Sequence, residues 1–256
     1  MEEKAVYFNP IKSKRTFDEI AIEIKKMIVG GVLRPGDRLP SEAEIAKQFN
    51  VGRQTVREAL RLLELSGFVM VHKGGGGGAI ITNTIIDTIR KSFMDAAQMR
   101  DISVAELTYA RAEIEKLVIC RAVENSTDED IAVLNENITQ GRKAIASGVQ
   151  AFEENMDFHV LLAKASKNAI FAIIVESLMA IVSDLLSRIP QSLEISKKIL
   201  EEHKQMVDAI AGRDKDRAID LLDKHLDFVG KRFNSSFEEL AKQNRVGTTG
   251  ERATQR

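Results

Sequence analysis

The stretch LPSEAEIAKQFNVGRQTVREALRLLELSGF, residues 39–68, carries the signals of two short helices joined by a tight turn. Ser41 and Glu44 have the spacing of a capping box, in which the hydroxyl accepts from the Glu44 amide and the carboxylate reaches back. The first helix is expected to end at Asn50, a residue that tolerates the left-handed conformation. The second helix is expected to begin at Arg53.

The flanking segments complete a winged helix-turn-helix. Upstream, apolar residues at helical spacing predict a helix over residues 17–28. Downstream, short β-like runs at residues 68–71 and 79–82 are joined by a turn over residues 74–78. In proteins with this order of elements, the second helix of the pair enters the major groove of DNA.

The second helix has polar residues that can contact DNA on the side opposite its apolar stripe. Four of them lie in its first turns: Arg53, Gln54, Thr55 and Arg57. Arginine can bond guanine in a bidentate manner, and glutamine can do so with adenine. Taken alone, the same pattern also fits an exposed polar helix face.

The predicted hairpin tip favours the DNA interpretation. Five glycines at residues 74–78 follow His72 and Lys73, which gives a slim tip beside a cation that suits a minor groove. A glycine run can instead cradle nucleotide phosphates. That alternative lacks a Gly-Lys-Ser/Thr ending, and here the run enters a strand rather than a helix.

The segments LPSE (39–42), VGRQTVREAL (51–60) and GFV (67–69), with Leu63, resemble the signature of the GntR family of bacterial regulators over about residues 15–82. The resemblance implies a set of operator contacts: Arg53, Gln54, Thr55 and Arg57 on the helix, and Lys73 and Gly74 on the wing. The family commonly has Arg at the position of Ala43 and a hydroxyl residue at that of Gly52. These departures bear on the operator sequence and not on the fold.

Composition and charge fit a soluble, two-domain protein. Of the 256 residues, 44% are hydrophobic and 29% are charged. Residues 1–82 carry a formal charge of +3 and the remainder −4, so a weakly basic head precedes an acidic body. The single cysteine, Cys120, excludes a disulfide framework and predicts a reducing, cytoplasmic location. The longest apolar stretch, residues 169–182, is interrupted by polar residues, so no membrane span is expected.

Three of the four histidines lie in the all-helical body. His159, His203 and His225 each fall within the apolar stripe of a separate predicted helix, so all three are expected to point into a helical core. A single histidine of this kind is usually a buried core residue. Three converging imidazoles instead suit a site for Zn, Ni, Fe or Mn built inside a helical bundle.

Arg111 also lies in an apolar stripe, where a charge is costly unless it is paired. One interpretation is a structural ion pair with an acidic residue, for example on a facing helix. The other is an anion clamp whose planar guanidinium grips a carboxylate through two hydrogen bonds.

These features resemble the FCD domain of the FadR branch of GntR regulators, over roughly residues 84–240. The matching pieces include Glu106-Leu107, Arg111, Glu115, Phe158-His159, Glu202-His203 and His225-Leu226. The resemblance implies a divalent metal held by Asn155, His159, His203 and His225, with Asn155 standing where metal-binding members have aspartate. It also implies a small carboxylate or sugar-acid effector bound to the metal and to Arg111. The histidine cluster speaks against a long-chain acyl-CoA.

The sequence therefore predicts a mainly α protein with three parts. These are a winged helix-turn-helix domain (1–82), a helical effector-binding domain of six to seven helices (83–241) and a disordered tail (242–256). We expect a homodimer that represses transcription from palindromic double-stranded operator DNA and does not act at a membrane. A metal-dependent enzyme is the alternative, but no HExxH motif, nucleophile elbow or paired general acid–base arrangement is evident, so we expect no enzyme.

Overall fold

The computed structural model of the chain describes residues 16–72, 78–82, 84–100, 102–190 and 192–250, with the backbone alone at 234 and 236–250. The described part is mainly α-helical, with one two-stranded sheet, so the predicted fold class is confirmed. The chain divides into two compact units, which we call the N-terminal unit (Met1–Ile89) and the C-terminal unit (Arg90–Arg256). This division falls inside a helix, whereas the domain boundary expected from the sequence is at residue 82.

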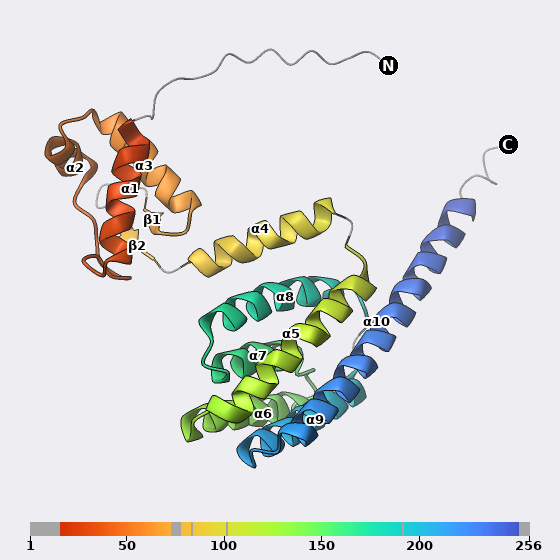
Figure 1. Cartoon of the computed structure of the whole chain (residues 1–256). Helices are drawn as coiled ribbons and strands as arrows, with labels where there is room; N and C mark the ends of the chain where they lie inside the picture. The colour runs from red at the N-terminus through yellow and green to blue at the C-terminus, as the bar shows by residue number, and fades with distance from the viewer. Residues whose placement is uncertain (1–15, 73–77, 83, 101, 191, 251–256) are drawn as a thin grey trace. The chain divides into compact units, whose positions relative to one another are not determined.

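The N-terminal unit combines three helices with a β-hairpin (Figure 1). In chain order its elements are α1 (Thr16–Val29), α2 (Glu42–Phe49), α3 (Arg53–Leu65), β1 (Val69–Val71) and β2 (Ala79–Ile81). α3 packs against both α1 and α2. Its buried residues form the apolar stripe seen in the sequence: Val56, Ala59, Leu60 and Leu63.

Local chemistry sets the bounds of the helix pair. The capping box is present, because Ser41 Oγ accepts from the Glu44 amide and Glu44 Oε2 accepts from the Ser41 amide. Asn50 ends α2 in the left-handed conformation, with φ 52° and ψ 49°. Gly67 has a φ of +75°, and a Cβ there would lie 2.8 Å from the Thr84 carbonyl oxygen, so the turn from α3 into β1 requires glycine.

The hairpin packs one face onto the helices. β1 and β2 are antiparallel, with Val69 opposite Ile81 and Val71 opposite Ala79. Val69, Ala79 and Ile81 are buried with the helical core, as the alternation of a half-buried strand requires. Residues 73–77 of the wing tip, including the predicted contacts Lys73 and Gly74, lie outside the described residues.

The C-terminal unit is a helical bundle (Figure 1). Its elements are the C-terminal part of α4 (Ile85–Met99), α5 (Val104–Asn125), α6 (Asp128–Ala146), α7 (Phe152–Ala165), α8 (Ala169–Ser187), α9 (Leu193–Ala211) and α10 (Lys215–Gly250). Side chains cap four of these helices at the N-terminus: Ser103, Thr127, Asn168 and Ser192. Helices α5, α7, α9 and α10 pack closely together and enclose the candidate site.

Among the described helices, α8 has the length and the apolar composition that would allow it to cross a membrane. In the structure it packs against α5 and α7, and part of its surface is buried in the bundle core. Core helices of soluble proteins pass the same test when their apolar residues extend around the whole circumference. Ile170 and Ile174 on its outer side are 62% and 37% exposed, so the described residues leave an apolar strip of α8 uncovered.

The end of the chain differs from the expected disordered tail. α10 continues as one helix to Gly250, past residue 242 where the tail was expected to begin. No proline interrupts the segment between Lys215 and Gly250, so no residue there removes a backbone donor from the helix. Residues 251–256 lie outside the described residues.

Candidate metal centre

The three histidines converge in the core of the C-terminal unit. α7 carries His159, α9 carries His203 and α10 carries His225, and each side chain is at most 2% exposed. Their ring centroids lie 4.8–5.4 Å apart. One potential ligand nitrogen from each ring lies within 4.8 Å of the other two. The rings need to move only slightly closer together for all three imidazoles to reach one ion at the 2.0–2.1 Å distance usual for a nitrogen ligand of zinc.

The protonation state of His159 follows from its two partners. Its Nδ1 lies 2.6 Å from Glu115 Oε2, and its Nε2 lies 2.7 Å from a terminal guanidinium nitrogen of Arg111. Arginine has only donors, so His159 Nε2 must accept and therefore carries no proton. The proton consequently sits on Nδ1 and is donated to Glu115. This tautomer leaves Nε2 as the nitrogen that can ligate a metal.

His225 has a similar carboxylate partner. Its Nδ1 lies 2.8 Å from Glu202 Oε2, and Glu202 directly precedes His203 on α9. A carboxylate that accepts from one ring nitrogen orients the imidazole and directs the other nitrogen to the metal. His159 and His225 are thus both held in the arrangement that metal-ligating histidines commonly show.

His203 supplies the test of whether the residues fit a metal. The side chain is fully buried and stacks on Phe158 at a centroid distance of 3.9 Å, yet neither of its ring nitrogens has a hydrogen-bond partner among the described residues. Buried polar atoms without a partner are rare in folded proteins, because their desolvation is not compensated. A metal ion between the three rings would satisfy one of these nitrogens, so the donor set fits a divalent ion.

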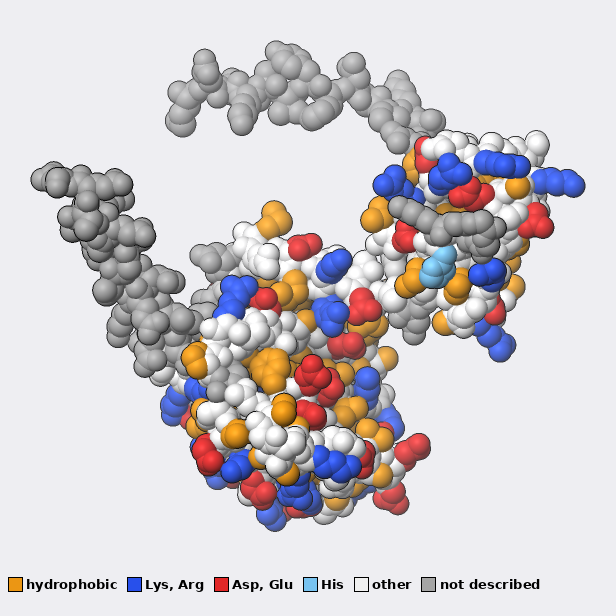
Figure 2. Space-filling model, turned by 180° about the vertical axis from the view of Figure 1, so that it is seen from behind, with side chains coloured by type: hydrophobic (Ala, Val, Ile, Leu, Met, Phe, Trp, Pro, Cys, Tyr) orange, Lys and Arg blue, Asp and Glu red, His pale blue; other side chains and the backbone are white. Residues whose placement is uncertain are grey.

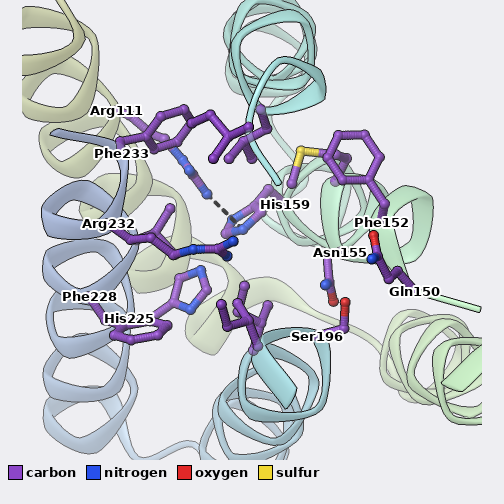
Figure 3. Close-up of a pocket in the computed structure, with 16 residues that line it drawn as sticks. Arg111, Gln150, Phe152, Asn155, His159, Ser196, His225, Phe228, Arg232 and Phe233 are labelled. Atoms are coloured by element: carbon purple, nitrogen blue, oxygen red, sulfur yellow. Dashed lines mark hydrogen bonds between the residues drawn. The ribbon is translucent and has the colours of Figure 1, made fainter. Parts of the chain in front are cut away.

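Asn155 lies one turn before His159 on α7 and lines the same pocket. Its side chain is buried, and its Oδ1 also lacks a hydrogen-bond partner in the part of the chain that the structure describes. Figure 3 shows this side chain directed toward Ser196 on α9. Asp157, two residues further along α7, is exposed and therefore projects away from the site.

Arg111 is engaged in an ion pair, but the partner is on its own helix rather than on a facing one. Its Nε lies 2.5 Å from Glu115 Oε1, one turn further along α5, and both side chains are almost fully buried. Burial alone would raise the pKa of Glu115, but Arg111 and His159 outweigh it and hold the pKa well below its usual range. The structure therefore shows Arg111 in a buried ion pair with Glu115.

Burial also keeps the imidazoles neutral. It lowers the pKa of His159 to about 4, despite the opposing charge of Glu115. Burial also places the pKa of His203 well below its usual value. It lowers the pKa of His225 too, although the Glu202 carboxylate acts to raise that pKa. Neutral imidazole is the form that binds metal.

Lowering the pH from 7 to 6 should destabilise the metal-free protein by up to about 2 kcal/mol. The three folded-state pKa values lie below the usual value of 6.5, so the unfolded chain takes up these protons first. Their contribution is present above pH 6.5 and is lost as the pH falls toward the folded pKa values. Thermal melts of chelator-treated protein measure it. His72→Ala, which removes an exposed histidine, is the control and should leave the pH dependence unchanged; a melting temperature independent of pH would contradict three buried neutral imidazoles.

A small pocket borders the cluster (Figure 3). It has a volume of about 30 Å³, and its wall is mostly apolar, with these polar members: Arg111, Gln150, Asn155, His159, Ser196, His225 and Arg232. None of the described residues that line it is Asp or Glu. This volume suffices for an ion with water, whereas sites for organic ligands usually measure several hundred Å³. An organic acid therefore requires the pocket to open.

Sequence reasoning did not assign three residues that the structure brings to the site. Glu115 and Glu202 hold the histidines, and Arg232 enters the pocket from α10 with its guanidinium bonded to the Pro190 carbonyl oxygen. Arg232 lies seven residues after His225, which places both on one helix face, and this spacing was the signal that could have revealed it. No local pattern in the sequence indicates that Glu115 and Glu202 are histidine partners.

The predicted DNA-contacting residues of α3 differ in their surroundings. Arg53, Gln54 and Arg57 are exposed, while Thr55 is half-buried. Arg57 forms a bidentate ion pair with Glu42 on α2, with distances of 2.7 and 3.2 Å. On the face shown in Figure 2, Lys and Arg side chains project from the surface of the N-terminal unit.

Both halves of the chain match known protein families. Residues 16–77 match the family described as bacterial regulatory proteins, gntR family, and residues 106–228 match the FCD domain. The HTH-type transcriptional repressor NanR of Klebsiella aerogenes is 30% identical over 232 residues, which is 86% of each chain. The Uxu operon regulator of Haemophilus influenzae is 28% identical over 221 residues, 84% of this chain and 80% of its own length.

A solved structure agrees with the fold. The Streptococcus agalactiae GntR structure superimposes with a TM-score of 0.68 at 21% identity, covering 84% of this chain and 99% of that one. The relatives are regulators, so the alternative of a metal-dependent enzyme is wrong. The chain belongs to the GntR family of bacterial regulatory proteins, in the FadR-type branch that joins a gntR helix-turn-helix to an FCD domain.

Proposed function

We propose that this chain is a cytoplasmic transcription repressor that binds a palindromic operator as a homodimer and is controlled by a small organic acid. The acid would bind in the C-terminal unit at a divalent metal held by His159, His203 and His225. The family supports DNA binding through α3, and the names of the relatives, a transcriptional repressor and an operon regulator, support repression. The FCD domain supports control by an effector.

The observation that carries the metal assignment is His203. Three buried, neutral imidazoles face one another, and two of them are oriented by glutamates. No described residue is a hydrogen-bond partner for either ring nitrogen of the third. The ion would act as a Lewis acid that attracts an acid's carboxylate. The residues of this chain would hold the ion and keep the imidazoles neutral.

His203→Ala should therefore lower metal affinity by more than the roughly 10–100-fold loss that follows removal of an outer partner of a metal ligand. Calorimetric titration of chelator-treated protein with Zn²⁺ measures this. His72→Ala is the matched control, because it removes an exposed histidine of the N-terminal unit. Equal Zn²⁺ binding by wild type and His203→Ala would mean that the three histidines are core residues.

Control of operator binding by the effector requires a separate measurement. Addition of the effector acid in the presence of metal should change the affinity for operator DNA, measured by fluorescence anisotropy at fixed salt. The salt concentration must be constant, because phosphate contacts make affinity strongly salt-dependent. Wild type should release the duplex and His203→Ala should not respond.

The homodimer is proposed to form through the C-terminal unit, with the exposed apolar strip of α8 in the interface. Ile170 and Ile174, one helical turn apart on α8, are 62% and 37% exposed. Introducing Glu at both positions should yield a monomer in sedimentation at micromolar concentration and weaken operator binding. Val149→Glu, at a 59% exposed position between α6 and α7, is the control and should remain dimeric. A double variant that stays dimeric would exclude this face.

A further inference from the structure

Arg57 and Glu42 form an ion pair between the two helices of the helix-turn-helix. Glu42 is the first residue of α2, and Arg57 lies one turn after the start of α3. Arg57 Nε donates to Glu42 Oε1 at 3.2 Å, and Arg57 Nη2 donates to Glu42 Oε2 at 2.7 Å. The hydrogen bond with Arg57 lowers the pKa of Glu42, so the carboxylate is charged at neutral pH.

This pairing occupies one edge of the Arg57 guanidinium. Arginine has five N–H donors in a planar group, and two parallel donors lie along the Nε and Nη2 edge and again along the Nη1 and Nη2 edge at the tip. Glu42 takes the first of these edges. The Arg57 side chain is 61% exposed, so its tip is accessible to a ligand. Two parallel donors are what O6 and N7 of guanine accept in the major groove.

The ion pair also restricts the directions in which the tip of Arg57 can point. An unpaired arginine side chain has many rotamers and loses this freedom when it binds one base. Glu42 restricts the rotamers before DNA arrives, because it holds the guanidinium plane against the start of α2. Exposed ion pairs contribute little to stability, so the effect expected of this pair is on orientation. Arg53 lies one turn before Arg57 and is also exposed, so both arginines project from one face of α3.

Glu42 also neutralises the charge of Arg57. An unpaired arginine on a DNA-binding surface attracts the phosphates of any sequence. The carboxylate of Glu42 repels the same phosphates, so the pair as a whole adds little to sequence-independent binding. The pair would therefore gain from DNA mainly where a base offers two acceptors to the tip of Arg57.

We propose that Glu42 is a positioning residue for operator recognition, which holds Arg57 so that its tip reads a guanine in each half of the operator. The proposal rests on the DNA-binding function proposed above, in which α3 enters the groove. Glu42→Gln keeps the size of the side chain but leaves a single acceptor for the guanidinium. This variant should lose preference for the guanine and bind unrelated sequences more tightly, with a steeper salt dependence, because the released arginine can then bond phosphates.

The test is selection from a randomised double-stranded DNA library by full-length wild type and variants, followed by sequencing. Arg57→Ala and Glu42→Gln should relax the preference at the same base pair of each half-site by at least about fivefold, the lower end of what one bidentate contact discriminates. The double variant should lose no more than Arg57→Ala, since Glu42 acts through Arg57. Glu19→Gln, which removes the same charge from an exposed position on α1, is the control and should select the wild-type sequence.

The possible failures of this selection have distinct meanings. A guanine preference that survives Glu42→Gln would overturn the positioning role. A preference that Glu42→Gln changes even when Arg57 is alanine would mean that Glu42 contacts a base itself, which also overturns it. An Arg57→Ala variant that selects the wild-type sequence would assign Arg57 to phosphate contact and remove the basis of the proposal. Enrichment of no sequence by the wild type would overturn the proposed operator binding as a whole.

Discussion

Replacing Arg111 by methionine should destabilise the C-terminal unit by about 3–5 kcal/mol. The Glu115 side chain is 1% exposed and bonds Arg111 and His159. Without the guanidinium, the buried Glu115 carboxylate keeps only the neutral imidazole of His159 as partner. It must then either stay charged in a buried position or take up a proton, and both cost free energy. Hydrogen exchange of amides in α5 and α7, followed in rising urea, measures the change in that unit.

Two further variants make this result specific. Arg111→Met combined with Glu115→Gln removes both charges and should recover most of the lost stability, because no uncompensated ion remains. Arg188→Met breaks the exposed pair with Asp184 on α8 and should cost at most about 1 kcal/mol. If the Arg111 and Arg188 variants lose equal stability, the buried pair has no special role in holding the site.

In a dimer, Arg53→Ala removes one base contact from each half. We expect this to weaken binding to the specific operator by about 2–6 kcal/mol, which is a loss of at least roughly 30-fold in affinity. Arg53 is exposed as the first residue of α3, the end of the helix that would reach the groove floor. Fluorescence anisotropy on operator and scrambled duplexes at one salt concentration separates lost specificity from lost charge.

Arg61→Ala is the matched control for the DNA measurement. It removes the same charge from an exposed position two turns further along α3. We expect it to weaken binding to both duplexes slightly and evenly, since a distant cation contributes only through the phosphate backbone. An operator affinity unchanged by Arg53→Ala would rule out the assignment of α3 as the base-reading helix.

The fold followed from local signals in the chain. The capping box of Ser41 and Glu44, the left-handed Asn50 and the apolar stripe of α3 all appear in the structure as expected. Each depends on residues within a few positions of one another, so sequence alone could reveal them. α10 was the exception, because it continues as a helix to Gly250, into the segment 242–256 that was expected to be disordered.

The sequence by itself determined that three histidines and Arg111 face the interior, because helical periodicity decides which side chains of a helix are buried. Only the tertiary structure decided what each of them contacts. Glu115 on α5 contacts His159 on α7, 44 positions away in the chain, and Glu202 on α9 contacts His225 on α10, 23 positions away. Periodicity gives the direction of a side chain relative to its own helix, whereas the tautomer, the charge balance and the partners of a buried group depend on how separate helices pack.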